Sequence, residues 1–126
     1  MSTDQSVWTP AEIRRRYDGG ERDFRGLDIY DPPAPGDSFR GAVLDDADFC
    51  DAFICADFTG ASLRNCKFRA NLKTCIFDHA DLRGADFTDA SIDSATFRSA
   101  RLEGATFAGA GAYGYDFKAG ELPKDD

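Results

Sequence analysis

The chain has 126 residues, of which 42% are hydrophobic and 30% charged, a balance that suits one folded domain and argues against wholesale disorder. Its formal net charge of −8 argues against direct binding to nucleic acid or to an anionic membrane, and favours a basic partner. No apolar run approaches the roughly 20 residues that span a bilayer, and the start MSTDQSVWTP lacks the regions of a secretory signal, so we expect a cytoplasmic protein.

The N-terminal segment, residues 1–23, carries a compact helix signal at about Pro10 to Asp18. Thr9 can cap this helix, Pro10 suits its first position, and Glu12 completes a capping box. We expect the helix to cover the first turn of the region that follows, because an uncovered β-structure end exposes unpaired backbone groups and invites association.

The stretch ERDFRGLDIYD predicts an incomplete first coil, in which Phe24 and Ile29 lie five apart and in phase with Phe39. Between them and Phe39 lies DPPAPGDS, residues 31–38, whose three prolines cannot donate ladder hydrogen bonds. We expect a loop insertion here. Such loops often carry function, although simple packing on the coil is the alternative.

Residues 24–117 form a repeat region with a period of five, of which ADFCD, ASLRN, ADLRG, ADFTD and ATFRS are clear copies. This period matches neither the 3.6 of a helix nor the 2 of a strand. A chain that turns a corner every five residues keeps the large residues on the inside. Four corners make one square coil of about twenty residues, and successive coils stack about 4.8 Å apart.

Assigning the successive large residues to four faces in turn tests this geometry. The first face receives Phe39, Phe58, Phe77, Phe97 and Phe117. The second receives Leu44, Leu63, Leu82 and Leu102, and the third receives Phe49, Phe68, Phe87 and Phe107. The fourth receives Ile54, Leu72, Ile92 and Ala112. Each face then holds one type of large residue, aromatic or aliphatic, in nearly every coil. This holds only if the four-residue steps from Ile54 to Phe58 and from Phe68 to Leu72 each advance the chain by one full face with a shortened corner.

The pattern resembles the A-(D/N)-L-x-x unit of pentapeptide-repeat proteins over about Phe39 to Phe117, with departures at Asp37, Ala112 and Tyr115. The resemblance implies an all-β solenoid, namely a right-handed quadrilateral β-helix with the central large residue pointing inward. With the helix expected at the N-terminus, the fold would be such a β-helix with a short capping α-helix.

The C-terminal part has no second helix signal and ends in a polar tail, residues 118–126. Tyr113 and Tyr115 lie at the last coil. Either these tyrosines and the tail cover that coil, or another copy of the protein does. A homodimer through this end is therefore a hypothesis.

Chemical motifs are scarce. Cys50, Cys55, Cys66 and Cys75 lack C-x-x-C spacing, and His79 is the only histidine. We expect free thiols, with Cys66 and Cys75 as small core residues and Cys50 and Cys55 nearer the surface. No catalytic constellation, metal motif or cofactor-binding motif is evident, which predicts a protein that is not an enzyme.

Two functions compete. Val43, Phe53 and Ile76 are apolar at outward positions, which predicts a rigid module that contacts another protein; the alternative is that the loop or the N-terminal segment covers them. The sequence does not distinguish this module from an adaptor protein whose partner binds the loop and the N-terminal helix.

The pentapeptide-repeat resemblance also implies an acidic DNA mimic that binds DNA gyrase and protects it from quinolones or toxins. Candidate acidic contact residues are Asp45, Asp46, Asp48 and Asp51. Against this mimic, Asp48, Lys67 and Asp86 alternate in sign down the third face, as Asp45 and Arg64 do down the second.

Overall fold

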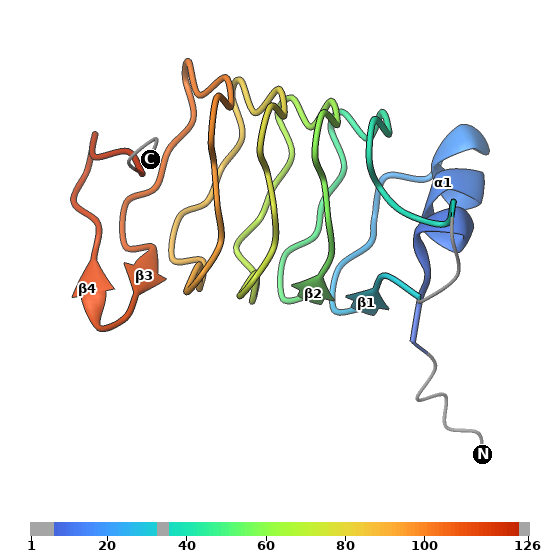
Figure 1. The fold of residues 1–126 in the computed structure, drawn as a ribbon, viewed down its shortest axis with the longest axis horizontal. Coiled ribbons are helices and arrows are strands. Elements are labelled where there is room, and N and C mark those ends of the chain that lie inside the picture. The colour runs from blue at the N-terminus through green and yellow to red at the C-terminus, as the bar shows by residue number, and fades with distance from the viewer. Residues whose placement is uncertain (1–6, 33–35, 124–126) are drawn as a thin grey trace.

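A computed structural model describes residues 7–32 and 36–123. Parts of the expected terminal segments (residues 1–6 and 124–126) and of the expected loop (residues 33–35) lie outside the described residues. In chain order, the elements are α1 (Pro10–Asp18), β1 (Asp28–Tyr30), β2 (Phe53–Cys55), β3 (Gly111–Ala112) and β4 (Tyr115–Asp116). Between α1 and β4 the chain winds in a row of stacked coils (Figure 1). Within the described part, no helix has the length and apolar character to cross a bilayer.

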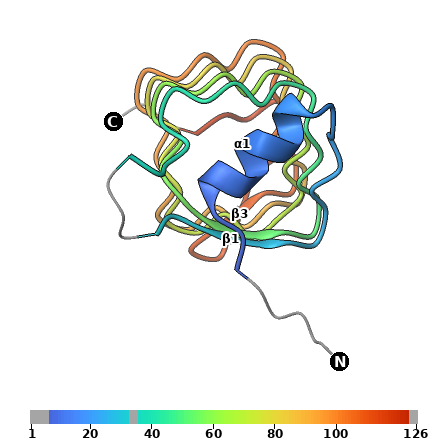
Figure 2. The same ribbon diagram turned by 90° about the vertical axis from the view of Figure 1, so that its right-hand side faces the viewer.

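Helix α1 spans the segment in which the sequence predicts a helix, and both halves of the capping box are present. Thr9 Oγ1 accepts from the Glu12 backbone N–H at 3.4 Å, and Glu12 Oε1 accepts from the Thr9 N–H at 3.2 Å. The helix lies across one end of the stack (Figure 2), where Ile13 is completely buried. Arg14 Nη2 donates to the Ser38 carbonyl at 2.7 Å and ties the helix to the coil beneath it.

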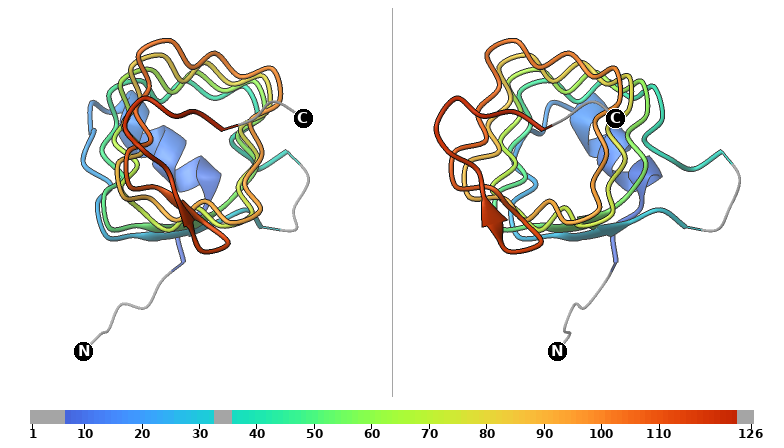
Figure 3. Two further views of the ribbon diagram at one scale, coloured as in Figure 1. Left: turned by 90° about the vertical axis from the view of Figure 1, so that its left-hand side faces the viewer. Right: turned by 60° about the vertical axis from the view of Figure 1, so that its left-hand side comes forward.

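Parallel backbone pairing stacks the coils. On the second face Val43 pairs with Ser62, Ser62 with Asp81, and Asp81 with Arg101. The other faces pair in the same way, so the chain returns to an equivalent position after about twenty residues, as its period predicts. Seen along the stack, each coil has four sides around a filled centre (Figure 3).

Stacked aromatic rings fill this centre. On the first face the Phe77 ring lies 5.2 Å from Phe58 and 5.1 Å from Phe97, nearly parallel to both. Phe68 and Phe87 form a second column on the third face, 5.0 Å apart. The two columns meet edge to face, since Phe77 and Phe87 lie 5.6 Å apart at 87°. Offset-stacked and edge-to-face contacts are the favoured arrangements of aromatic pairs.

The corners depend on a left-handed residue. At regular corners the second residue after the large one has a positive φ, as in Asn65 (59°) and Thr74 (65°). Neither shortened corner contains such a residue, because every residue from Ala52 to Thr59 and from Cys66 to Lys73 has a negative φ. The residue that each shortened corner omits is therefore the left-handed one, and the inward residues stay in their columns.

One expectation about phase is wrong. Phe24 stacks on Phe49 at 5.5 Å, and Ile29 lies in register with Ile54, so they belong to the third and fourth faces. Phe39 stacks on Phe58 and thus belongs to the very next face. The ten-residue step from Ile29 to Phe39 is one face with an insertion rather than two faces.

Replacing Phe77 by alanine removes a ring that contacts four others, and we expect a loss of about 3–5 kcal/mol in the free energy of unfolding. Urea denaturation measures it. The control is Phe117→Ala, because Phe117 is half-buried at the end of the stack and should cost clearly less. Equal costs at the two positions would contradict a core held mainly by its central rings.

Candidate functional site

The three apolar residues predicted to face outward do so, but they lie on three faces. Val43 pairs along the second face, Phe53 along the fourth, and Ile76 along the first. Val43 is 58% exposed, Phe53 is 40% exposed, and Ile76 is half-buried. The structure therefore does not gather them into a single contact surface.

Phe53 instead has an aromatic neighbour that the sequence analysis missed. The Tyr30 ring stacks on the Phe53 ring at 5.8 Å and 18°, and Tyr30 is itself 37% exposed. Strands β1 and β2 pair in parallel, with Asp28 beside Phe53 and Tyr30 beside Cys55. We call Tyr30 and Phe53 the aromatic patch. The sequence did carry a signal for Tyr30, because this residue directly follows the inward Ile29 and therefore faces outward. Since Ile29 was assigned to the wrong face, Phe53 was not recognised as a neighbour of Tyr30.

The aromatic patch lies where β1 and β2 run side by side, on the same side of the stack as β3 (Figure 1). The N-terminal segment extends this surface. The Trp8 N–H donates to the Asp28 carbonyl at 2.8 Å, and the Tyr30 N–H donates to the Trp8 carbonyl at 3.1 Å. Trp8 thus pairs beside β1 and does not lie over Phe53, so the described part of this segment, from residue 7 onward, leaves the patch exposed.

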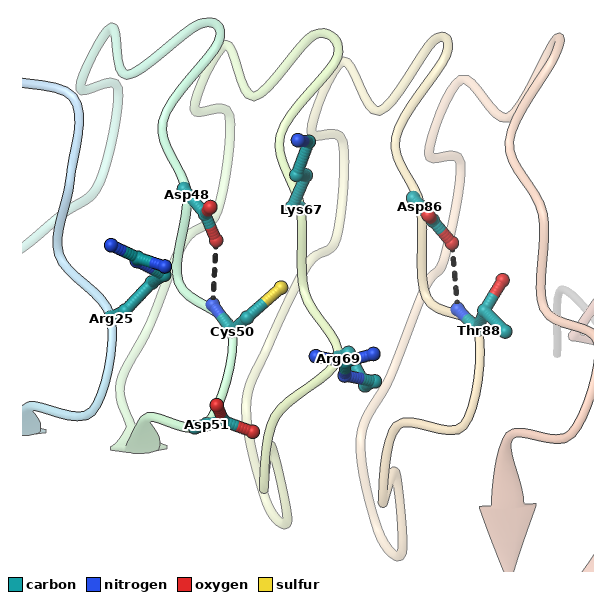
Figure 4. A pocket seen from close by; sticks show the side chains of 8 residues that line it. All are labelled: Arg25, Asp48, Cys50, Asp51, Lys67, Arg69, Asp86 and Thr88. Atoms are coloured by element: carbon teal, nitrogen blue, oxygen red, sulfur yellow. Dashed lines mark hydrogen bonds between the residues drawn. The ribbon is translucent and has the colours of Figure 1, made fainter.

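A mixed-charge groove of about 390 Å³ runs along the third face (Figure 4). Its lining residues are Arg25, Asp48, Cys50, Asp51, Lys67, Arg69, Asp86 and Thr88. Lys67 pairs through its backbone with Asp48 on one side and Asp86 on the other, which confirms the alternation of sign down this column. Burial, together with a hydrogen bond to Asp48, raises the pKa of the Cys50 thiol, so a thiolate nucleophile is disfavoured here.

The four acidic candidate residues follow one coil around its corners and do not run along the stack. Asp46 and Asp51 are corner residues with positive φ, and Asp48 lies on the third face. Asp45 is neutralised by Arg64, whose Nη2 lies 2.8 Å from its Oδ2. Burial alone would raise the pKa of Asp45, but hydrogen bonds from Arg64 and Ser62 hold it below its usual value.

The cysteines divide as the sequence predicts. Cys66 and Cys75 are buried, and their thiols donate to the carbonyls of Leu44 and Ile54, both at 3.1 Å. Cys50 and Cys55 are only half-buried. Among residues 7–32 and 36–123, all four thiols are free and no group of three potential metal ligands occurs. His79 is exposed at a corner.

At the C-terminal end, β3 and β4 form a short antiparallel pair that carries exposed Tyr113 and Tyr115. The Tyr115 hydroxyl donates to Glu121 at 2.7 Å, which fixes part of the tail. Leu102, in the last coil, is half-buried, whereas the leucines of earlier coils on this face are fully buried. This end is therefore less completely covered than the end beneath α1.

The sequence matches the family model for pentapeptide repeats in eight copies, over residues 38–69 and 68–104, which is just over half of the chain. The chain belongs to the pentapeptide-repeat family. Proteins of this family fold as right-handed quadrilateral β-helices and are generally structural or interaction modules. A search of curated proteins found no match.

Three solved pentapeptide-repeat structures are similar to the chain. HetL from the cyanobacterium Nostoc sp. strain PCC 7120, involved in heterocyst differentiation regulation, is 22% identical over 75% of this chain and 43% of its own, with a TM-score of 0.37. A second protein from Nostoc PCC 7120 is 24% identical over 94% of this chain and 93% of its own, with a TM-score of 0.38. One from the Arabidopsis thaliana thylakoid lumen is 26% identical over 71% and 60%, with a TM-score of 0.25. The pentapeptide-repeat chain thus spans less than half of HetL.

The buried thiols predict how stability depends on pH. Burial raises the pKa of Cys66 and of Cys75 to about 12, whereas a thiol in an unfolded chain titrates near 8.5. Because the folded pKa is the higher one, this stability is fully present below about pH 8.5 and falls as the pH rises toward 12. At about pH 9.5 we expect a loss of roughly 1.4 kcal/mol per thiol.

Urea denaturation of the parent protein and of Cys66→Ala at about pH 7.5 and pH 9.5 tests this pH dependence. The variant should lose roughly 1.4 kcal/mol less than the parent between the two conditions. Cys75 is present in both proteins, so its contribution cancels in the comparison. The same loss in both would show that the Cys66 thiol does not carry the effect.

Proposed function

We propose that this pentapeptide-repeat protein is a non-enzymatic interaction module, a right-handed quadrilateral β-helix capped by α1, that binds another protein through the aromatic patch. The observation that carries the proposal is the stacked, exposed pair of Tyr30 and Phe53 on the paired strands β1 and β2. Large aromatic side chains dominate the binding energy of many protein interfaces.

The rigidity of the support favours this use. Ile29 and Ile54 lie beneath the patch, and both are completely buried. Each ring also restricts the other, because the two are stacked. A partner would therefore order few side chains when it binds, and the entropic cost of association would be small.

A DNA mimic receives less support from the geometry. DNA carries one negative charge per about 1.7 Å of its axis, so a mimic needs carboxylates along its length. Here the candidate carboxylates ring one coil, Asp45 is paired with Arg64, and Lys67 interrupts the column between Asp48 and Asp86.

Replacing Phe53 by aspartate should abolish capture of the native partner from cell extract and leave the fold intact, because the side chain points outward. Capture by the immobilised protein, with circular dichroism and a melting curve for each variant, measures both. Val43→Asp is the matched control, since Val43 is more exposed but lies on another face. Unchanged capture by the Phe53 variant, or loss in both variants, would refute the patch as the contact surface. Unfolding of the Phe53 variant would refute its exposure.

We also propose that two copies associate through the C-terminal end, around Tyr113 and Tyr115. The support is that α1 covers the other end, whereas the Leu102 and Phe107 backbone N–H groups donate to no residue in the described part of the chain. Unpaired groups of this kind favour further pairing.

Light scattering after size-exclusion chromatography over a range of concentrations tests the homodimer. We expect the mass to rise toward twice the 13.8 kDa of the chain in the parent protein. Tyr113→Asp should stay at the monomer mass, because it places a charge in the proposed contact. A parent protein that stays monomeric at the highest concentration removes this proposal, but leaves the one for the aromatic patch untouched.

A further inference from the structure

Two other partly exposed aromatic rings near the N-terminal end each carry an arginine of the same chain. The Arg16 guanidinium lies over the Trp8 ring, 4.2 Å from its centroid, and that of Arg22 lies 3.6 Å from the Tyr17 centroid. The aromatic patch is larger than either ring, yet no cation of the described residues lies over it. Its outer surface is therefore open to a cation from elsewhere.

Two carboxylates flank the patch. Asp28 is the register partner of Phe53 on β1, and Asp51 lies with Phe53 on the lining of one shallow hollow. Both are exposed, and neither forms an ion pair with any residue that the structure describes. Among the described residues, the carboxylates that do pair with an arginine are Glu21, Asp23, Asp45, Asp57, Asp78, Asp81 and Glu103. Unpaired carboxylates beside an unoccupied aromatic surface are complementary to a cationic side chain.

The next coil limits the size of this acidic region. Arg69 lines the same hollow as Asp51 and Phe53. Lys73 lies two residues after Asn71, the neighbour of Phe53 on the fourth face. Neither cation forms an ion pair within the described residues. The region thus extends over about two coil spacings, roughly 10 Å. This length suits one or two cationic side chains and disfavours a long basic tract, which would meet these two cations.

We propose that the aromatic patch, together with Asp28 and Asp51, binds an arginine side chain presented by a segment of the partner protein. This proposal rests on the proposed function, and it specifies the kind of side chain through which the partner protein would bind. Arginine fits better than lysine, because a planar guanidinium stacks on a ring and donates two parallel hydrogen bonds to a carboxylate at the same time. The internal contacts of Arg16 with Trp8 and of Arg22 with Tyr17 use the same stacking.

Titration of the ¹⁵N-labelled full chain followed by NMR tests this proposal. The probe is an acetylated and amidated hexapeptide, Gly-Ser-Arg-Gly-Ser-Gly. The matched control peptide carries citrulline in place of arginine, and so keeps the planar shape without the charge. We expect amide shifts confined to β1, β2 and the residues around Asp51. We also expect affinity for the citrulline peptide to be at least about five-fold weaker, since the contact with the ring and with two carboxylates needs the charge.

Variants of the protein locate the site. Phe53→Ser should weaken binding of the arginine peptide about two- to five-fold, the effect of losing one exposed cation–ring contact. Asp28→Asn should weaken it and reduce its dependence on salt. Val43→Ser should leave it unchanged. Equal binding of the two peptides, shifts on another face, or an unaltered affinity in Phe53→Ser would each overturn the proposal.

The two proposals fail in different ways. If Phe53→Asp abolishes capture of the native partner and the arginine peptide gives no shift at β1 and β2, the patch is a contact surface but its ligand is not arginine. If Phe53→Asp leaves capture unchanged and the arginine peptide still binds at the patch, the site for the cation is real but the native partner docks elsewhere.

Discussion

The contact between phenylalanine rings in the centre of the stack is the constraint on which the rest of the structure depends. Phe58, Phe77 and Phe97 lie nearly parallel at separations close to the spacing of paired strands, so ring stacking and backbone pairing have the same repeat. The edge-to-face contacts with the third face then fix the two columns relative to each other. With the interior set in this way, each outward side chain has a defined position on one face.

The period of five was enough to predict the columns, the corners and the buried cysteines, because all of these follow from counting. The right-handed quadrilateral β-helix was implied by the resemblance to the pentapeptide-repeat family. The same counting also assigns Val43, Phe53 and Ile76 to separate faces, as the pairing of the coils shows. The start of helix α1 could also be predicted from the sequence, because the capping box of Thr9 and Glu12 depends only on residues close together in the chain. What the counting missed is the neighbour of Phe53. The insertion before Phe39 adds a whole repeat length, so it leaves the apparent phase intact while shifting Tyr30 by one face.

The surface shows two different uses of charge. Along much of the stack, carboxylates meet arginines, as in Asp45 with Arg64 and Asp57 with Arg40. The arginines of these surface pairs are exposed, and such pairs contribute little to stability. Around the aromatic patch, Asp28 and Asp51 have no such partner among the residues that the structure describes. A repeat fold suits this division of roles, because one outward position can change without altering the inward residues that hold the coil.

The two shortened corners have a consequence for how the chain assembles. Coils with nearly identical interiors can dock one place out of step during folding, since phenylalanine would still meet phenylalanine and leucine would still meet leucine. A coil with a shortened corner lacks one left-handed residue, so it cannot take the position of a coil that has this residue. Its backbone N–H and C=O groups would then lie out of register with those of the adjacent coil. The shortened corners at Ala56 and Ala70 therefore make neighbouring coils non-equivalent, and they raise the free energy of arrangements in which the stack is shifted by one coil.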